Sequence, residues 1–196
     1  MQIDEQLTKC LVITNYRTGS RDFCIKNERK NRLKMNLFEI IHKGGKYLPI
    51  KPAVEQMRNT KKFIAKVMPD QFAYDFEKLE QLMGPSEQIV YLYRKDFRAQ
   101  CLSWIASNYR NDYDRISSIQ GADFLIDIDQ TFADKHIQMI EKNNDFLKEC
   151  IKRYPAPVYA YEDINDGNPY KRSYNWKYMP FIKDYNTEEI YNETIV

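Results

Sequence analysis

The sequence predicts an α/β fold, with a mostly parallel β-sheet that carries helices on both faces, in a single domain of 196 residues. Two observations predict it. Short apolar runs rich in β-branched and aromatic residues recur along the chain, as is typical of buried strands. Segments with apolar residues at helical spacing separate these runs. Strands that alternate with helices form parallel sheets, because a crossover must bring the chain back in the same direction.

The first predicted strand covers residues 9–14 and reads Lys-Cys-Leu-Val-Ile-Thr. A turn follows this strand. Ser20 then stands where it can cap a helix over residues 21–34, with Asp22 in the first turn. That segment is polar for a helix, and its main apolar residues are Phe23, Cys24, Leu33 and Met35.

Two further strands are predicted in the middle of the chain, over residues 62–68 and 88–93. Residues 72–83 lie between them and carry apolar side chains at helical spacing, which predicts a connecting helix. A second helix, over residues 96–109, is predicted to follow the later strand.

The last part of the chain begins with a long amphipathic pattern over residues 132–154, which predicts a helix that Pro155 ends. A final strand is predicted over residues 158–161, and an irregular tail from about residue 166. No internal repeat or low-complexity stretch divides the chain, so residues 1–196 are expected to form one domain.

The composition excludes several classes of protein. The chain is 43% hydrophobic and 14% aromatic with a formal net charge of +2, which is the wrong composition for disorder. The near balance of charge predicts no nucleic-acid partner. Apolar runs of a few residues, against about 20 needed to cross a bilayer, predict no membrane association. The first residues lack the basic and apolar regions of a signal peptide, so we expect a cytoplasmic protein.

The cysteines and histidines predict neither disulfides nor a metal site. Four cysteines lie far apart without a CxxC pair, and the chain has two histidines. A small secreted scaffold would be denser in cysteine, and a zinc site would show paired spacing. We therefore expect reduced thiols at Cys10, Cys24, Cys101 and Cys150.

Residues suited to anion binding follow the first predicted strand. A helix N-terminus presents N–H groups and the positive end of its dipole, and Gly19 allows the backbone to come close to a ligand. The hydroxyls of Thr18 and Ser20, together with Arg17, would complete a phosphate cradle. The alternative is an ordinary turn between a strand and a helix, and the loop alone does not distinguish the two.

A second group of such residues follows the strand at 88–93. Arg94 and Lys95 stand at its end, and Ser103 follows about two turns into the next predicted helix. Two cations and a hydroxyl in this arrangement would grip a second phosphate. The alternative is a solvated charge cluster.

Taken together, the two segments resemble the sulfotransferase family that uses 3′-phosphoadenosine 5′-phosphosulfate (PAPS), in its bacterial, nodulation-type branch. Leu11-Val-Ile-Thr-Asn-Tyr-Arg-Thr-Gly-Ser20 is similar to the family's phosphosulfate loop. Ile89-Val-Tyr-Leu-Tyr-Arg-Lys-Asp-Phe-Arg-Ala-Gln-Cys-Leu-Ser-Trp104 is similar to its 3′-phosphate segment. A softer likeness, to a late Tyr-Glu-Asp-Leu strand, covers residues 158–164, so the resemblance spans about residues 9 to 164.

The resemblance implies a P-loop-like sulfotransferase fold and a donor site. It places the 5′-phosphosulfate on Arg17, Thr18, Gly19 and Ser20. Ser103 matches the serine that contacts the 3′-phosphate. The family arginine lies eight residues before that serine, where this chain has Lys95, with Arg94 one place earlier, so either cation is a candidate.

Two further points come from the same comparison. The family has small or apolar residues where this chain has Arg21 and Asp22, and Arg21 would offset the charge of Asp22 beside a phosphate. A basic C-terminal loop often closes over the nucleotide in the family, which makes Lys171 and Arg172 candidates here; a disordered tail is the alternative.

The general base that would take a proton from the acceptor has two candidates. Glu39 matches the glutamate of the nodulation-type branch, and we expect it to be the base. His42 is the alternative, since a histidine is the base in the cytosolic branch and its reference pKa lies near neutrality. His136, within the long predicted helix, is expected to be structural.

The function expected from the resemblance is transfer of a sulfuryl group from PAPS to a hydroxyl or amine of a carbohydrate or other small molecule, without a metal. One alternative is an inactive module of the same fold that binds nucleotide or polyanions. A nucleotide-dependent kinase is disfavoured, because Gly-x4-Gly-Lys-Ser/Thr is absent and Arg17 precedes the glycine. Residues 44–52 and 107–121 are the expected walls of the acceptor pocket.

Overall fold

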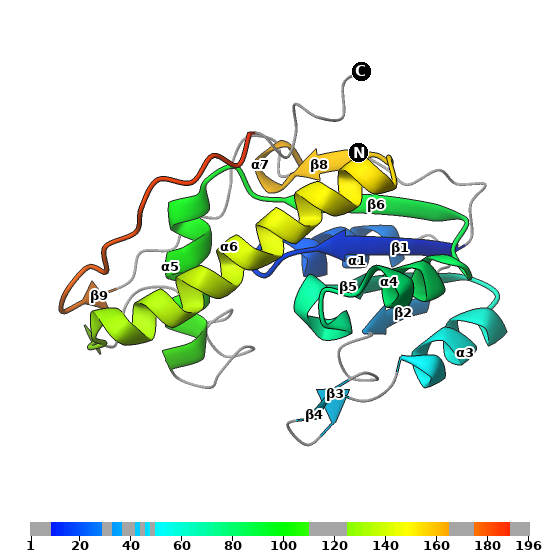
Figure 1. Ribbon diagram of the computed structural model, residues 1–196, viewed down its shortest axis with the longest axis horizontal. Helices are drawn as coiled ribbons and strands as arrows, with labels where there is room; N and C mark the ends of the chain where they lie inside the picture. The colour runs from blue at the N-terminus through cyan, green and yellow to red at the C-terminus, as the bar shows by residue number, and fades with distance from the viewer. Residues whose placement is uncertain are drawn as a thin grey trace.

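A computed structural model describes residues 9–28, 33–36, 42–43, 46–47, 50–109, 125–164 and 175–188. Within these residues, five parallel strands form the central sheet in the order β2-β5-β1-β6-β8 (Figure 1). The strands are β1 (Lys9–Thr14), β2 (Leu33–Asn36), β5 (Phe63–Val67), β6 (Gln88–Tyr93) and β8 (Val158–Ala160). The α/β class with a parallel sheet is thereby confirmed.

Two short ladders accompany the sheet in the described part of the chain. β3 (His42–Lys43) pairs with β4 (Lys46–Tyr47) in the antiparallel direction. β7 (Leu125–Ile126) pairs with β9 (Asn175–Trp176) in the parallel direction. β9 lies in the segment that the sequence predicts to be irregular, since a two-residue strand leaves no periodic pattern in a sequence.

The central strands are apolar at nearly every position because both faces of the sheet are covered. Along β1, Leu11 and Ile13 join one buried cluster, and Cys10 and Val12 join another on the opposite face. Side chains that alternate between faces are what a strand provides. A strand buried on both faces therefore appears in the sequence as an uninterrupted apolar run.

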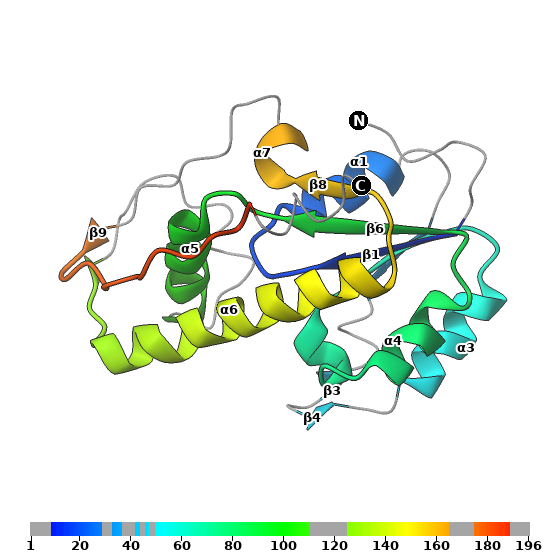
Figure 2. The same ribbon diagram turned by 45° about the horizontal axis from the view of Figure 1, so that its top comes forward.

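Three helices cover the face to which Leu11 and Ile13 contribute. They are α3 (Lys51–Asn59), α4 (Phe76–Met83) and α6 (Gln130–Arg153). The buried residues of α3, of α4 and of the second half of α6 share one cluster with the strands. Figure 2 shows α6 running along this face and continuing past the end of the sheet. Helix α6 begins at the N-cap Asp129, whose carboxylate accepts the Phe132 N–H at 2.7 Å.

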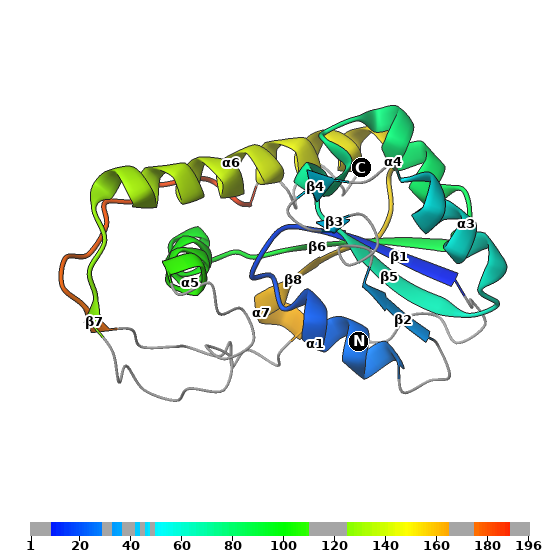
Figure 3. The same ribbon diagram turned by 90° about the horizontal axis from the view of Figure 1, so that it is seen from below.

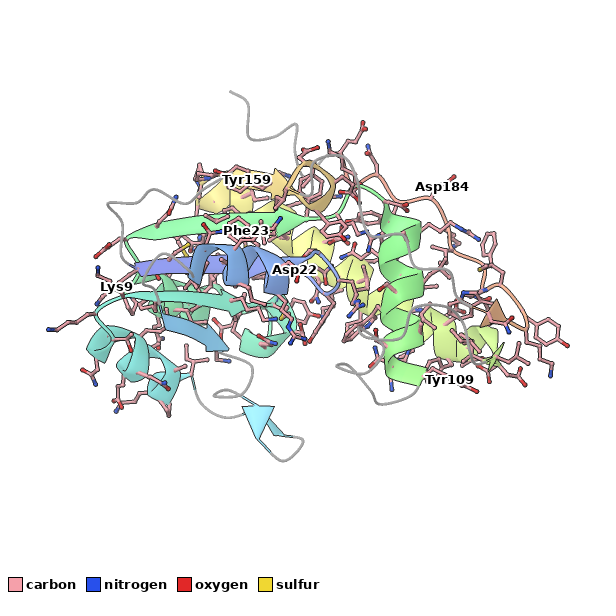
Figure 4. The ribbon with its side chains drawn as sticks, turned by 180° about the vertical axis from the view of Figure 1, so that it is seen from behind. Lys9, Asp22, Phe23, Tyr109, Tyr159 and Asp184 are labelled. Carbon is pink, nitrogen blue, oxygen red and sulfur yellow. The ribbon has the colours of Figure 1, made fainter. Side chains whose placement is uncertain are left out.

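The opposite face is covered by α1 (Ser20–Glu28), through Phe23 and Cys24. Figure 3 shows α1 and α6 on opposite sides of the sheet. Figure 4 shows the molecule from behind, with α1 in front of the strands. Of the two α1 residues labelled there, Asp22 is exposed and Phe23 is buried. The expected placement of helices on both faces is confirmed.

A third buried cluster lies beyond the end of the sheet. The helix α5 (Phe97–Tyr109) packs there against the first half of α6, and Ile182 of the tail joins them. This cluster holds α5 at the carboxyl end of β6, where Ser103 was expected to act.

Two expectations about secondary structure were wrong. The helix predicted over residues 21–34 ends at Glu28, and residues 33–36 form β2, because Leu33–Asn36 pairs with Phe63–Lys66 along β5. The last strand ends at Ala160. Tyr161 instead begins the short helix α7 (Tyr161–Ile164).

Other boundaries differ less. The helix predicted over residues 72–83 begins at Phe76, since a 3₁₀ helix, η1 (Pro69–Phe72), precedes it and Ala73 and Tyr74 have positive φ angles. Helix α3 was not predicted, since its short polar sequence buries a narrow stripe of Ala53, Val54 and Met57. The part of the chain with described coordinates contains no helix that could cross a membrane.

Candidate functional site

The candidate site lies at the carboxyl ends of β1 and β6, which are neighbours in the sheet with Thr14 beside Leu92. After β1 the chain passes to α1 on one face, and after β6 it passes through α5 to α6 on the other. Adjacent parallel strands whose connections diverge in this way open a crevice at their carboxyl ends, where ligands bind in open α/β sheets. The two predicted phosphate-binding segments, after β1 and after β6, therefore lie next to each other.

The loop after β1 has an unusual backbone. Arg17 and Gly19 have φ angles of 59° and 68°, in the left-handed region. Helix α1 starts at Ser20, and the Phe23 N–H donates to the Gly19 carbonyl at 3.0 Å. The amides before Phe23 have no carbonyl one turn back within the helix to accept their hydrogen bonds. Left-handed residues beside such amides form the concave N–H surface that binds anions.

The hydroxyl of Thr18 bonds within the protein. The side chain is completely buried, and it donates to the Asn15 carbonyl at 3.0 Å and contacts the Thr14 hydroxyl. Ser20 is also buried, whereas Arg21 is exposed. The loop's anion-binding groups are therefore its backbone amides and Arg17.

A buried network of side-chain amides, which the sequence did not predict, connects the loop after β1 to α6. Asn15 donates to the Asn144 side chain at 2.7 Å and to the Ile140 carbonyl at 2.9 Å. Asn143 donates to Asn15 Oδ1 at 3.0 Å. The sequence did contain one indication of this network, the adjacent Asn143 and Asn144 inside an amphipathic helix. Asparagine is unfavourable in a helix interior, so two in a row indicate that their side chains have another role.

Two of the predicted site residues are in direct contact. Arg17 Nε donates to Ser103 Oγ at 2.7 Å, which joins the loop after β1 to helix α5. Ser103 is 7% exposed and Arg17 is half-buried, so this hydrogen bond is partly shielded from solvent. A guanidinium carries five N–H donors in a planar fork, which is the geometry that binds anions.

Arg94 and Lys95 occupy different environments. Arg94 is 8% exposed; its Nη1 donates to the Arg17 carbonyl at 3.4 Å and its Nε lies 3.7 Å from Glu162 Oε1. Lys95 is exposed and pairs with Asp163 at 2.8 Å. Arg94 is thus an internal cation, and Lys95 is the solvated one.

Helix α7 connects the two loops. The Tyr161 ring lies against Gly19 and under the Arg94 guanidinium, whose Cζ is 5.0 Å from the ring centroid. Glu162 accepts the N–H groups of Lys95 and Asp96 at 2.9 and 3.2 Å. This segment resembles a strand motif in its sequence, and the motif implies no role for Glu162.

A carboxylate stands beside the loop at the end of β5. Asp70 accepts the Tyr16 hydroxyl at 2.7 Å and the Asn143 amide at 3.3 Å. The Tyr16 ring stacks on Trp104 with centroids 4.0 Å apart, and Gln100 donates to the Tyr16 carbonyl at 2.7 Å. These contacts hold Tyr16, and with it the backbone of Arg17, in place.

Three predicted site residues, Glu39, Lys171 and Arg172, lie outside the described residues. The structure describes His42 by its backbone, within β3. His136 is on α6, where its Nδ1 donates to the Phe132 carbonyl at 2.8 Å. The helical hydrogen bond agrees with the structural role expected for His136.

The cysteine thiols are buried and none forms a disulfide. Burial raises the pKa of Cys101 and raises the pKa of Cys150 to about 12, so both thiols stay protonated near neutral pH. The described residues contain no group of three or more His, Cys, Asp or Glu side chains that could hold a metal ion.

Comparison of the chain with protein-family models and with curated proteins finds no match. The chemistry of the site is therefore inferred from its own geometry. An N–H surface, one arginine held by a serine and a second, exposed cation at Lys95 are together suited to a ligand with two separate anionic groups.

Proposed function

We propose that the protein is a PAPS-dependent sulfotransferase with a P-loop-like fold. It transfers a sulfuryl group to a hydroxyl or amine of a carbohydrate or other small molecule. The observation that carries the proposal is the 2.7 Å contact of Arg17 Nε with Ser103 Oγ. It joins two motifs that are 86 residues apart and that resemble the two phosphate-binding segments of one family.

The donor would lie across the carboxyl ends of β1 and β6. Its 5′-phosphosulfate would face the loop amides and Arg17, at the N-terminus of α1. Its 3′-phosphate would face Ser103 and the exposed Lys95. The spacing of the two strands supports the proposal, since adjacent strand ends present both groups to one ligand.

The reaction places most of its demands on positioning and charge. The acceptor oxygen or nitrogen attacks sulfur, the bond from sulfur to the bridging oxygen breaks, and adenosine 3′,5′-bisphosphate leaves. The acceptor proton passes to the base. Negative charge builds on the bridging oxygen, where the Arg17 guanidinium would stabilise it. This scheme requires no metal.

Ligand binding tests the proposal directly. Adenosine 3′,5′-bisphosphate should raise the melting temperature more than AMP or ATP does, since it alone carries phosphates at both positions. Ligand at 100 times its dissociation constant adds about 2.7 kcal/mol of stability. Equal stabilisation by AMP would contradict a 3′-phosphate grip, and preferential stabilisation by ATP would favour the kinase alternative.

Two variants distinguish the candidates for the base. Glu39→Gln should cut PAPS-dependent turnover by at least about 10²-fold with donor affinity unchanged, because it removes the basic oxygen and keeps the side chain's size. His42→Asn should reduce turnover only mildly. An inactive His42→Asn together with an active Glu39→Gln would reverse the assignment.

A further inference from the structure

We propose that Arg94 and Glu162 form an internal charge pair that positions Arg17 and does not contact the 3′-phosphate, for which Lys95 is the cation. The inference rests on the proposed function and assigns different tasks to the two adjacent cations. It depends on the burial of Arg94 and on its contacts with the Arg17 carbonyl, Glu162 and the Tyr161 ring.

The first step concerns where the Arg94 guanidinium is held. Glu162 lies on one side of it, the Tyr161 ring on another, and the Arg17 carbonyl accepts from Nη1. The Arg94 side chain is 9% exposed and that of Glu162 is 18% exposed. A cation this buried needs a partner charge, and Glu162 supplies it.

The second step concerns Glu162, whose two oxygens are both occupied. Oε2 accepts the Lys95 N–H, and Oε1 accepts the Asp96 N–H and faces Arg94 Nε. The carboxylate therefore fixes the turn between β6 and α5 as well as the guanidinium. Glutamine could not replace it, because an amide has one acceptor oxygen. Its NH2 group would face one of the backbone N–H groups that Glu162 accepts.

The third step concerns what Arg94 restrains. Arg17 has a φ angle of 59°, a conformation that costs free energy for a residue with a side chain. The hydrogen bond from Arg94 holds the Arg17 carbonyl, and the bond to Ser103 holds its side chain. Without Arg94, the loop would relax away from the geometry in which its amides converge on an anion.

The experiment compares two ligands that differ by one phosphate. Calorimetry gives the dissociation constants of adenosine 3′,5′-bisphosphate and of AMP for the full chain and its variants. Arg94→Met should weaken both ligands by about tenfold, the effect of releasing one strained residue, and keep the ratio of the two constants. Glu162→Gln should do the same to a smaller extent. Lys95→Met should weaken only the bisphosphate.

Asp163→Asn is the matched control. It removes one negative charge from the same helix, but from an exposed pair with Lys95 in which the two side chains are 45% and 54% exposed. It should weaken neither ligand. Melting temperatures of all variants show that each is folded at the temperature of the titration, and Glu162→Gln remains informative if Arg94→Met is not folded.

Each other outcome overturns the inference. A loss of the preference for bisphosphate in Arg94→Met would show that Arg94 grips the 3′-phosphate. Unchanged dissociation constants of both ligands in Arg94→Met and in Glu162→Gln would show that the pair stabilises the fold and does not position Arg17. Failure of the unmodified protein to bind either ligand would refute the proposed function itself, and the inference with it.

Discussion

Arg17→Ala is expected to lower the rate of sulfuryl transfer by about 10²–10³-fold, the usual effect of removing one donor that stabilises charge in a transition state. The fold should persist, because Arg17 is on a loop and is only half-buried. Ser103 Oγ, which accepts the hydrogen bond from Arg17 Nε, can accept one from water in its place. Turnover with PAPS and the melting temperature together check both statements.

Two other variants sharpen this result. Arg17→Lys keeps the charge but not the planar fork, so it should recover part of the rate. Arg98→Ala removes an exposed arginine from α5 and should leave turnover unchanged. A rate for Arg17→Ala equal to that of the unmodified protein would show that the contact with Ser103 is structural only.

Gly19→Ala is expected to lower the free energy of unfolding by about 2–4 kcal/mol. Two effects add together: the left-handed backbone conformation, and the steric overlap of the added methyl group with the Tyr161 ring. The φ angle of 68° is one that residues with a side chain rarely adopt. A Cβ atom there would lie 2.3 Å from Cδ2 of the Tyr161 ring. Urea denaturation measures the change.

Gly84→Ala provides the control for this prediction. Gly84 has a φ angle of −53°, and an added Cβ would meet its nearest atom at 3.6 Å, in ordinary contact. Alanine there should be neutral or stabilise the protein by up to about 1 kcal/mol. Equal losses at the two glycines would show that the Tyr161 contact does not constrain the loop.

The sequence by itself determined four of the five strands of the central sheet, and it predicted the two loops that meet at the candidate site. β1 and β6 have the bounds predicted, because strands buried on both faces appear in the sequence as short apolar runs. Arg17 and Ser103 were both identified from local motifs, since a turn after a strand and a hydroxyl on the following helix are features of short segments.

The tertiary structure decided what depends on partners distant in the chain. Residues 33–36 are a strand because β5 lies beside them, since four residues that alternate between apolar and polar are too few to predict that ladder. Arg94 and Lys95 are equivalent in the sequence, as two cations after a strand. Glu162 and Tyr161 arrive from α7 and bury the first of them, while Lys95 stays at the surface. Successive residues at a strand end point to opposite sides, so which cation is internal depends on which side a later element covers.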